Sequence, residues 1–222
     1  MNQIEKNTVS SKNQLKDKGP VRFFNESGKG LRVLFAGNSI TWHSYAPQIG
    51  WTNNCGMAAS ETEKDYVHIL MRKIKEKNPD AAFCITQVAD WEREFMHGED
   101  TYEKYEAGRE FGADLIIMRC VENCPYDNFD SEKFIEEYKK LMEFLDKDKK
   151  ARFIITTGFW KHIGDDSIRK AAKETGWPLV ELGDLGELDE MKAIGLFEHN
   201  GVANHPGDKG MQAIADRIFE VI

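Results

Sequence analysis

Two segments of the chain contain residue types and spacing that could carry out nucleophilic chemistry. Ser39 lies in segment 37–41 (GNSIT), directly after the apolar run at residues 31–36. Gly37 permits a tight turn there, which would present the Ser39 hydroxyl at the end of a strand. His205 lies before the last helical pattern, and a serine nucleophile needs a neighbouring base, most often histidine. On spacing alone, Ser39 could equally be a helix cap and His205 a surface residue.

A third candidate is Asn123, which follows Glu122 directly after the apolar run at residues 114–120. A side-chain amide at the end of a strand can donate a hydrogen bond to an oxyanion. Asparagine is common after strands, so Asn123 gains meaning only together with Ser39 and His205.

Five short apolar runs must position these residues. Each has the length and β-branched composition of a strand buried on both faces. The runs are residues 31–36, 81–88, 114–120, 151–157 and 178–182. Helical patterns fill the gaps: 64–77 after a Ser60–Glu63 capping box, 101–111, 131–147, 166–175, and 209–222 with Asp208 as its expected cap.

This alternation predicts an α/β protein, a three-layer α/β/α sandwich around a five-stranded parallel sheet. In such sheets, ligands bind beyond the carboxyl ends of the strands. Ser39 and Asn123 each follow a predicted strand, so we expect them at one edge of the sheet.

Composition and charge narrow the class of protein. The chain has 222 residues, 41% of them hydrophobic, and a formal net charge of −8. Nucleic-acid binding and polybasic membrane binding both need a clustered basic surface, so we expect neither partner. No apolar run approaches the ~20 residues that span a bilayer, and residues 1–20 lack the apolar core of a signal peptide. We therefore expect a cytoplasmic protein with a flexible extension at residues 1–20 and a single domain at 21–222.

Metals and cofactors are not expected. Cys55, Cys84, Cys120 and Cys124 lack the paired spacing of a zinc site, and we expect reduced structural thiols. The loop after the first predicted strand, which ends at residue 36, has neither a Gly-x-Gly-x-x-Gly motif nor a P-loop. This argues against a bound nucleotide or flavin.

Segment 37–41, Asn123 after the third run, and segment 205–211 (HPGDKGM) before the last helix together resemble the SGNH (GDSL-type) hydrolase superfamily over about residues 31–222. The resemblance implies a flavodoxin-like sandwich and ester hydrolysis, in many members of acetyl esters of carbohydrates. It implies that Ser39 is the nucleophile and His205 the base. The Ser39 N–H and the Asn123 amide would then form the oxyanion hole.

The chain departs from the pattern of this superfamily in two places. Segment 87–91 (QVADW) has no glycine where members of the superfamily have one, so the backbone N–H of Ala89 or Asp90 would supply the third oxyanion donor. Members usually have an aspartate three residues before the histidine, and here that position is Val202. We expect first a Ser–His dyad whose imidazole is held by a backbone carbonyl, and second a triad completed by Glu198.

Trp42, Trp160 and Glu122 follow predicted strands and are candidate substrate contacts, since aromatic faces suit sugar rings. The two tryptophans could equally be core residues, and Glu122 could instead pair with Arg119. The sequence therefore favours a serine esterase that removes a short acyl group, in particular acetyl, from a small-molecule or carbohydrate ester. The alternative is a catalytically impaired relative that binds carbohydrate. The sequence does not determine the oligomeric state.

Overall fold

The structure, a computed structural model, describes residues 19–222. A sheet of six strands in the order β1-β3-β2-β4-β5-β6 forms its centre. Five strands run parallel, as the sequence predicted, and they are β2 (Arg32–Gly37), β3 (Ala82–Gln87), β4 (Leu115–Arg119), β5 (Arg152–Thr156) and β6 (Leu179–Val180). The predicted extension at residues 1–20 lies almost wholly outside the described residues.

The sixth strand, β1 (Val21–Phe24), was not predicted, and it pairs antiparallel with β3 at the edge of the sheet. It has four residues, and only Val21 is fully buried. A strand this short, with one neighbour and one buried position, leaves little periodicity in the sequence.

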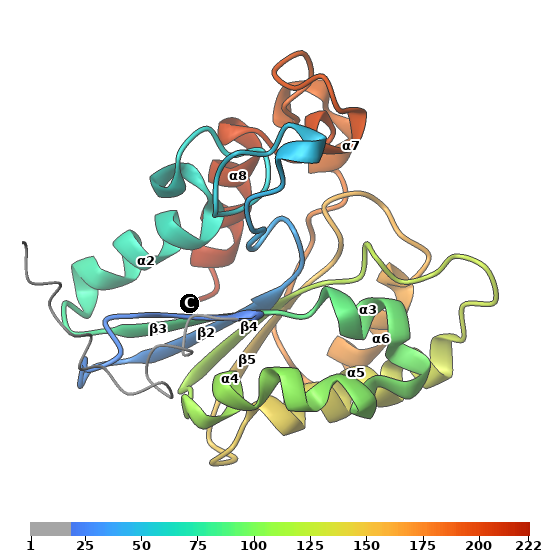
Figure 1. The fold of residues 1–222 in the computed structure, drawn as a ribbon. Coiled ribbons are helices and arrows are strands. Elements are labelled where there is room, and N and C mark those ends of the chain that lie inside the picture. The colour runs from blue at the N-terminus through green and yellow to red at the C-terminus, as the bar shows by residue number, and fades with distance from the viewer. Residues whose placement is uncertain (1–18) are drawn as a thin grey trace, which may run out of the picture.

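Helices cover both faces of the sheet (Figure 1). One face carries α2 (Tyr66–Lys77) and α8 (Asp208–Phe219), and the other carries α3 (Ala89–Glu94), α4 (Glu106–Glu110), α5 (Ser131–Leu145) and α6 (Asp165–Thr175). Alternate residues of β2 serve the two faces: Val33 and Phe35 belong to the core under α2 and α8, and Leu34 and Ala36 to the core under α5. Both sets are buried, which explains why the strand reads as a continuous apolar run.

The short elements are less regular than predicted. Segment 101–111 is split between the 3-10 segment η3 (Phe95–Tyr105) and α4. Further 3-10 turns are η1 (Pro47–Ile49), η2 (Thr62–Lys64), η4 (Leu185–Glu187) and η5 (Asp189–Met191), and α7 (Asn200–Ala203) is a single helical turn. Elements of three to six residues are too short to show a helical period in sequence.

Two predicted helix caps are wrong. The cap of α2 is Asp65, whose carboxylate accepts a 2.7 Å hydrogen bond from the His68 N–H. Ser60 is not part of a capping box: its N–H and hydroxyl donate to the Asp208 carboxylate at 2.8 and 2.7 Å. Asp208 is therefore turned toward Ser60, and α8 begins at Asp208 with Gly207 as its N-cap and without a side-chain capping bond.

The four cysteines, all within the described residues, are buried and unpaired, as predicted. Across residues 19–222, no helix is both long enough and apolar enough to cross a membrane.

Candidate active site

Ser39 and His205 meet at the carboxyl end of the sheet. The Ser39 Oγ lies 2.8 Å from Nε2 of His205, although the two residues are 166 positions apart. The other ring nitrogen, Nδ1, lies 2.6 Å from the carbonyl oxygen of Gly201. A carbonyl can only accept a hydrogen bond, so Nδ1 carries the proton and Nε2 accepts from the serine hydroxyl. This arrangement can deprotonate the hydroxyl.

A tight turn after β2 presents Ser39. The Asn38 carbonyl accepts hydrogen bonds from the N–H groups of Thr41 and Trp42, at 2.9 and 3.0 Å. Gly37 is needed at the start of the turn, because a Cβ atom there would lie 2.6 Å from the Arg119 carbonyl oxygen. The side chain of Ser39 is half-buried at the resulting corner.

His205 is held from three sides. Its N–H donates to the Val202 carbonyl at 2.9 Å, which fixes the chain just after α7. Its Nδ1 contacts Gly201, and the Trp160 ring packs edge-on against the imidazole, with ring centroids 5.1 Å apart and planes at 83°. The ring therefore has a fixed orientation toward Ser39.

The surroundings of His205 favour the neutral imidazole. Burial is the largest cause, and it lowers the pKa of His205 to about 4, assisted by the positive charge of Arg119 and opposed by the Gly201 carbonyl. A general base must be unprotonated at the working pH. The ring is therefore in the form that can accept a proton at neutral pH.

Ser39 and His205 line a cavity of about 240 Å³. Its wall also contains Asn123 and Ala89, together with residues from the surrounding segments: His43, Ile49, Met57, Gln87, Arg93, His199, Gly201 and Val202. A second cavity of about 560 Å³ shares Ile49 and His199 with the first, so the two adjoin.

The predicted oxyanion donors lie in the same cavity as Ser39. Asn123 Nδ2 donates one hydrogen to Glu92 Oε2 at 2.6 Å, and the amide has a second hydrogen to donate. Within residues 19–222 the Ser39 N–H has no hydrogen-bond acceptor. The Ala89 N–H donates to the side-chain Oε1 of Gln87 at 3.2 Å, so this donor is occupied by a side chain that can rotate away.

No protein-family model matches the chain, and no curated relative matches it. Several solved structures, however, are similar to this chain. A two-domain esterase active on acetylated mannans, co-crystallised with mannopentaose, aligns with a TM-score of 0.58 and 18% identity over 89% of this chain and 50% of that one. A family two carbohydrate esterase from Clostridium thermocellum, in complex with cellohexaose, aligns with a TM-score of 0.56 and 16% identity over 86% and 63%.

A member of the lipolytic protein G-D-S-L family from Veillonella parvula aligns with a TM-score of 0.50 and 14% identity over 86% of this chain and 98% of that chain. The chain has an SGNH/GDSL hydrolase-like fold. It spans about half the length of the two-domain esterase, and nearly the full length of the G-D-S-L protein.

Within this SGNH-like fold, four predicted site residues do not line the 240 Å³ cavity around Ser39: Trp42, Glu122, Trp160 and Glu198. Trp42 is a core residue: its Nε1 donates to the Asn54 carbonyl at 3.2 Å, and the Arg22 guanidinium covers its ring at 4.1 Å. Glu122 is buried and pairs with Arg119, the alternative that the sequence left open. Neither Trp42 nor Glu122 lines the cavity that contains Ser39, so the structure does not bring these two predicted substrate contacts to it.

Glu198 is exposed and lines the second cavity, whereas the Gly201 carbonyl holds the Nδ1 position that a third triad member would need. Within the described part of the chain, Glu198 makes no hydrogen bond or ion pair with His205. Trp160 lies against the imidazole and not in the wall of the 240 Å³ cavity.

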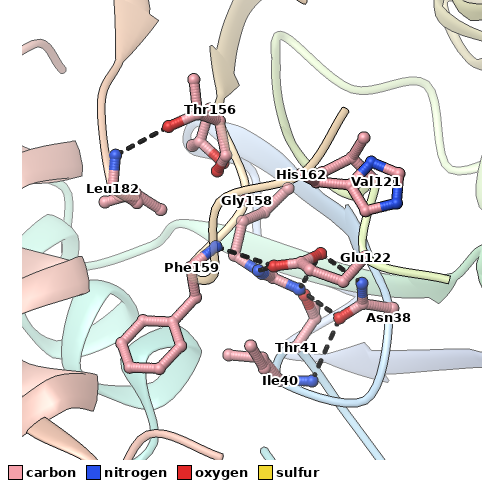
Figure 2. A network of polar contacts seen from close by, with 12 residues as sticks. Asn38, Ile40, Thr41, Val121, Glu122, Thr156, Gly158, Phe159, His162 and Leu182 are labelled. Atoms are coloured by element: carbon pink, nitrogen blue, oxygen red, sulfur yellow. Dashed lines mark hydrogen bonds and ion pairs between the residues drawn. The ribbon is translucent and has the colours of Figure 1, made fainter. Parts of the chain in front are cut away.

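Behind Ser39 the SGNH-like fold buries a polar network, of which the sequence indicated only the possible pairing of Glu122 with Arg119 (Figure 2). The fully buried Arg119 pairs through Nη1 with Glu122 Oε1 at 2.5 Å and donates through Nη2 to Asn38 Oδ1. Glu122 also accepts hydrogen bonds from Asn38 Nδ2 at 2.6 Å and from the Phe159 N–H at 2.8 Å. The network fixes the residue that precedes the serine.

Two carboxylates belong to this network, and their pKa values are shifted in opposite directions. Burial alone would raise the pKa of Glu122, but the Arg119 guanidinium holds it below the usual range. Burial, together with the negative charge of Glu122, raises the pKa of Glu92 to about 7. Glu92 lies in a charged stretch, 92–94 (ERE), which in sequence resembles any solvent-facing helix, so no signal marked it as part of the site.

Proposed function

We propose that the protein is a serine esterase that hydrolyses short-chain acyl esters, in particular acetyl esters of carbohydrates. The observation that carries the proposal is the 2.8 Å contact between Ser39 Oγ and His205 Nε2, with Nδ1 held on the Gly201 carbonyl. This contact lies in a cavity that also contains the oxyanion candidate Asn123.

The first half-reaction is acyl transfer to Ser39. His205 Nε2 takes the hydroxyl proton while Oγ attacks the ester carbonyl carbon. The developing oxyanion accepts hydrogen bonds from the Ser39 N–H, from Asn123 Nδ2, and from the Ala89 N–H once the Gln87 side chain has rotated away. The tetrahedral intermediate collapses, and His205 returns the proton to the departing alcohol.

The second half-reaction releases the acid. His205 deprotonates a water molecule that attacks the acyl-enzyme, and the same donors stabilise the second oxyanion. The bond between the acyl carbon and Ser39 Oγ then breaks, and His205 returns the proton to Oγ. In both halves the Gly201 carbonyl fixes the tautomer and stabilises the imidazolium, which is the role that an aspartate has in a triad.

The volumes and lining of the two cavities support a small acyl group and a larger alcohol. The 240 Å³ cavity around Ser39 suits the acyl group, and the adjoining 560 Å³ cavity suits the alcohol. The second cavity combines polar groups, Gln48, Glu198 and His199, with the apolar surfaces of Leu196 and Phe197. Mixed lining of this kind matches the polar edges and apolar faces of sugar rings. The esterases of similar fold act on acetylated mannans or were crystallised with an oligosaccharide.

The test compares turnover of p-nitrophenyl acetate, butyrate and octanoate, and of acetylated oligosaccharides, by the wild type and Ser39→Ala. We expect turnover of the acetate and the acetylated oligosaccharides, falling with acyl length and abolished by Ser39→Ala. Equal turnover by both proteins would refute the proposal. Oligosaccharide binding without turnover by the wild type would instead identify a catalytically impaired carbohydrate-binding protein.

A further inference from the structure

Glu92 is a buried carboxylate whose partners all belong to the candidate active site. It lies in α3, the short helix that follows β3, and its side chain has no exposed surface. A fully buried carboxylate is rare unless it is paired with a cation. The nearby guanidinium of Arg119 pairs with Glu122 instead.

The partners of Glu92 are three neutral N–H groups. Oε1 accepts from Asn38 Nδ2 at 2.9 Å and from the Val121 N–H at 2.5 Å. Oε2 accepts from Asn123 Nδ2 at 2.6 Å. One carboxylate therefore joins the turn that precedes Ser39 to the loop that carries Asn123.

The contact with Asn123 fixes the direction of its amide. An asparagine amide has two N–H hydrogens on one planar nitrogen. With one hydrogen on Oε2, the plane and rotation of the amide are set, and the second hydrogen is left for the cavity that Asn123 lines. Oxyanion stabilisation depends on donors that are oriented before the reaction begins.

We propose that Glu92 is a positioning residue for ester hydrolysis, which acts through Asn123 by holding one amide hydrogen so that the other points to the oxyanion. This inference rests on the proposed esterase function. Burial raises the pKa of Glu92 to about 7, so its environment disfavours the charge, whereas its three contacts all require an acceptor. A carboxylate kept at such a position has a role that an apolar residue could not fill.

A double-mutant cycle tests whether Glu92 acts through Asn123. In Glu92→Gln one carboxylate oxygen becomes an NH2 group that cannot accept. The remaining carbonyl oxygen satisfies two donors, Asn38 Nδ2 and the Val121 N–H, when it takes the Oε1 position, so the NH2 group faces Asn123 and the asparagine amide loses its anchor. We expect kcat for p-nitrophenyl acetate to fall by about 10²-fold, close to the loss of one oxyanion donor, with KM changed less than about twofold. In an Asn123→Ala background the same substitution should change kcat by less than about threefold.

The matched control is Glu137→Gln. Glu137 is a buried glutamate of α5, but its partners are Lys133 and Lys140, at 2.8 and 3.0 Å, and it contacts no residue of the cavity. We expect this variant to retain wild-type kcat and KM. An equal loss of kcat from Glu92→Gln in both backgrounds would overturn the proposal, because a general structural effect does not depend on Asn123.

A second measurement is independent of turnover. In 15N-labelled wild-type protein, the side-chain amide of Asn123 is assigned by its disappearance in Asn123→Ala. We expect one of its two protons to be shifted downfield and protected from exchange with solvent, to lose both properties in Glu92→Gln, and to keep them in Glu137→Gln. Two equivalent, rapidly exchanging protons in the wild type would overturn the proposal even if Glu92→Gln failed to fold. If Ser39→Ala retained esterase activity, the proposed function would fail while this spectrum still decided the role of Glu92.

Discussion

The position three residues before His205 offers a sharp test of how the imidazole is supported. Placing an aspartate there, Val202→Asp, restores the residue that SGNH hydrolases usually have. The structure predicts that this change does not raise turnover. The Gly201 carbonyl already occupies Nδ1 at 2.6 Å, and Val202 is a fully buried member of the core under α2 and α8.

The expected loss of stability in Val202→Asp follows from the burial of Val202. Removing the buried valine side chain forfeits about 1.5–3 kcal/mol of apolar burial. An unpaired carboxylate in its place adds a desolvation penalty of several kcal/mol. The sum is comparable with the ~5–15 kcal/mol by which a typical domain is stable. We therefore expect Val202→Asp to be strongly destabilised, with kcat no higher than that of the wild type.

Urea denaturation followed by tryptophan fluorescence measures the stability, and turnover of p-nitrophenyl acetate measures kcat. Val202→Ala separates the two costs, because it loses the methyl groups without adding a charge, and it should lose only the smaller part of the stability. A rise in kcat of tenfold or more in Val202→Asp, with unchanged stability, would show that the Gly201 carbonyl is an inadequate partner for the imidazole.

Three further expectations follow from the site. Asn123→Ala should lower kcat by about 10²–10³-fold with little change in KM, and near-normal turnover in steady-state kinetics would rule out its oxyanion role. Burial lowers the pKa of His205 to about 4, so its ring should stay neutral at pH 6 in an NMR titration. Because the unfolded chain takes up this proton near pH 6.5 and the folded chain only near 4, the contribution of His205 to stability falls as the pH drops through that window. A midpoint near 6.5 would contradict this account. Arg119→Ala leaves the buried Glu122 carboxylate unpaired and should destabilise the fold by about 3–5 kcal/mol in urea titrations, whereas unchanged stability would mean that the pair is not buried as described.

The sequence was informative about the sheet because its central strands are buried on both faces. Val33 and Phe35 face one core and Leu34 and Ala36 the other, which leaves an apolar run that needs no partner to be recognised. β1 has one neighbour and only one fully buried residue, so its pairing with β3 is a property of the folded sheet and has little local signature.

The residues of the site also differ in how far their role can be read from the local sequence. Ser39 and His205 stand in compact motifs with fixed places at strand and helix ends, and the structure brings them within hydrogen-bond distance. The partner of Nδ1 is a backbone carbonyl, and any residue type could supply it. Trp42 follows a strand, which in sequence is equally typical of a substrate contact and of a core residue, but the turn whose Asn38 carbonyl accepts its N–H carries the indole into the core. Contacts of this kind depend on where a turn directs a side chain, which spacing alone does not determine.

Activation of Ser39 as a nucleophile by His205 is tested most directly by labelling the folded protein with a fluorophosphonate. Intact-mass measurement and mapping of the modified peptide then locate the adduct. The geometry predicts one adduct, on Ser39, formed by the wild type, absent in Ser39→Ala and formed far more slowly in His205→Ala. No adduct, an adduct on another residue, or labelling that is unaffected by His205→Ala would contradict the claim.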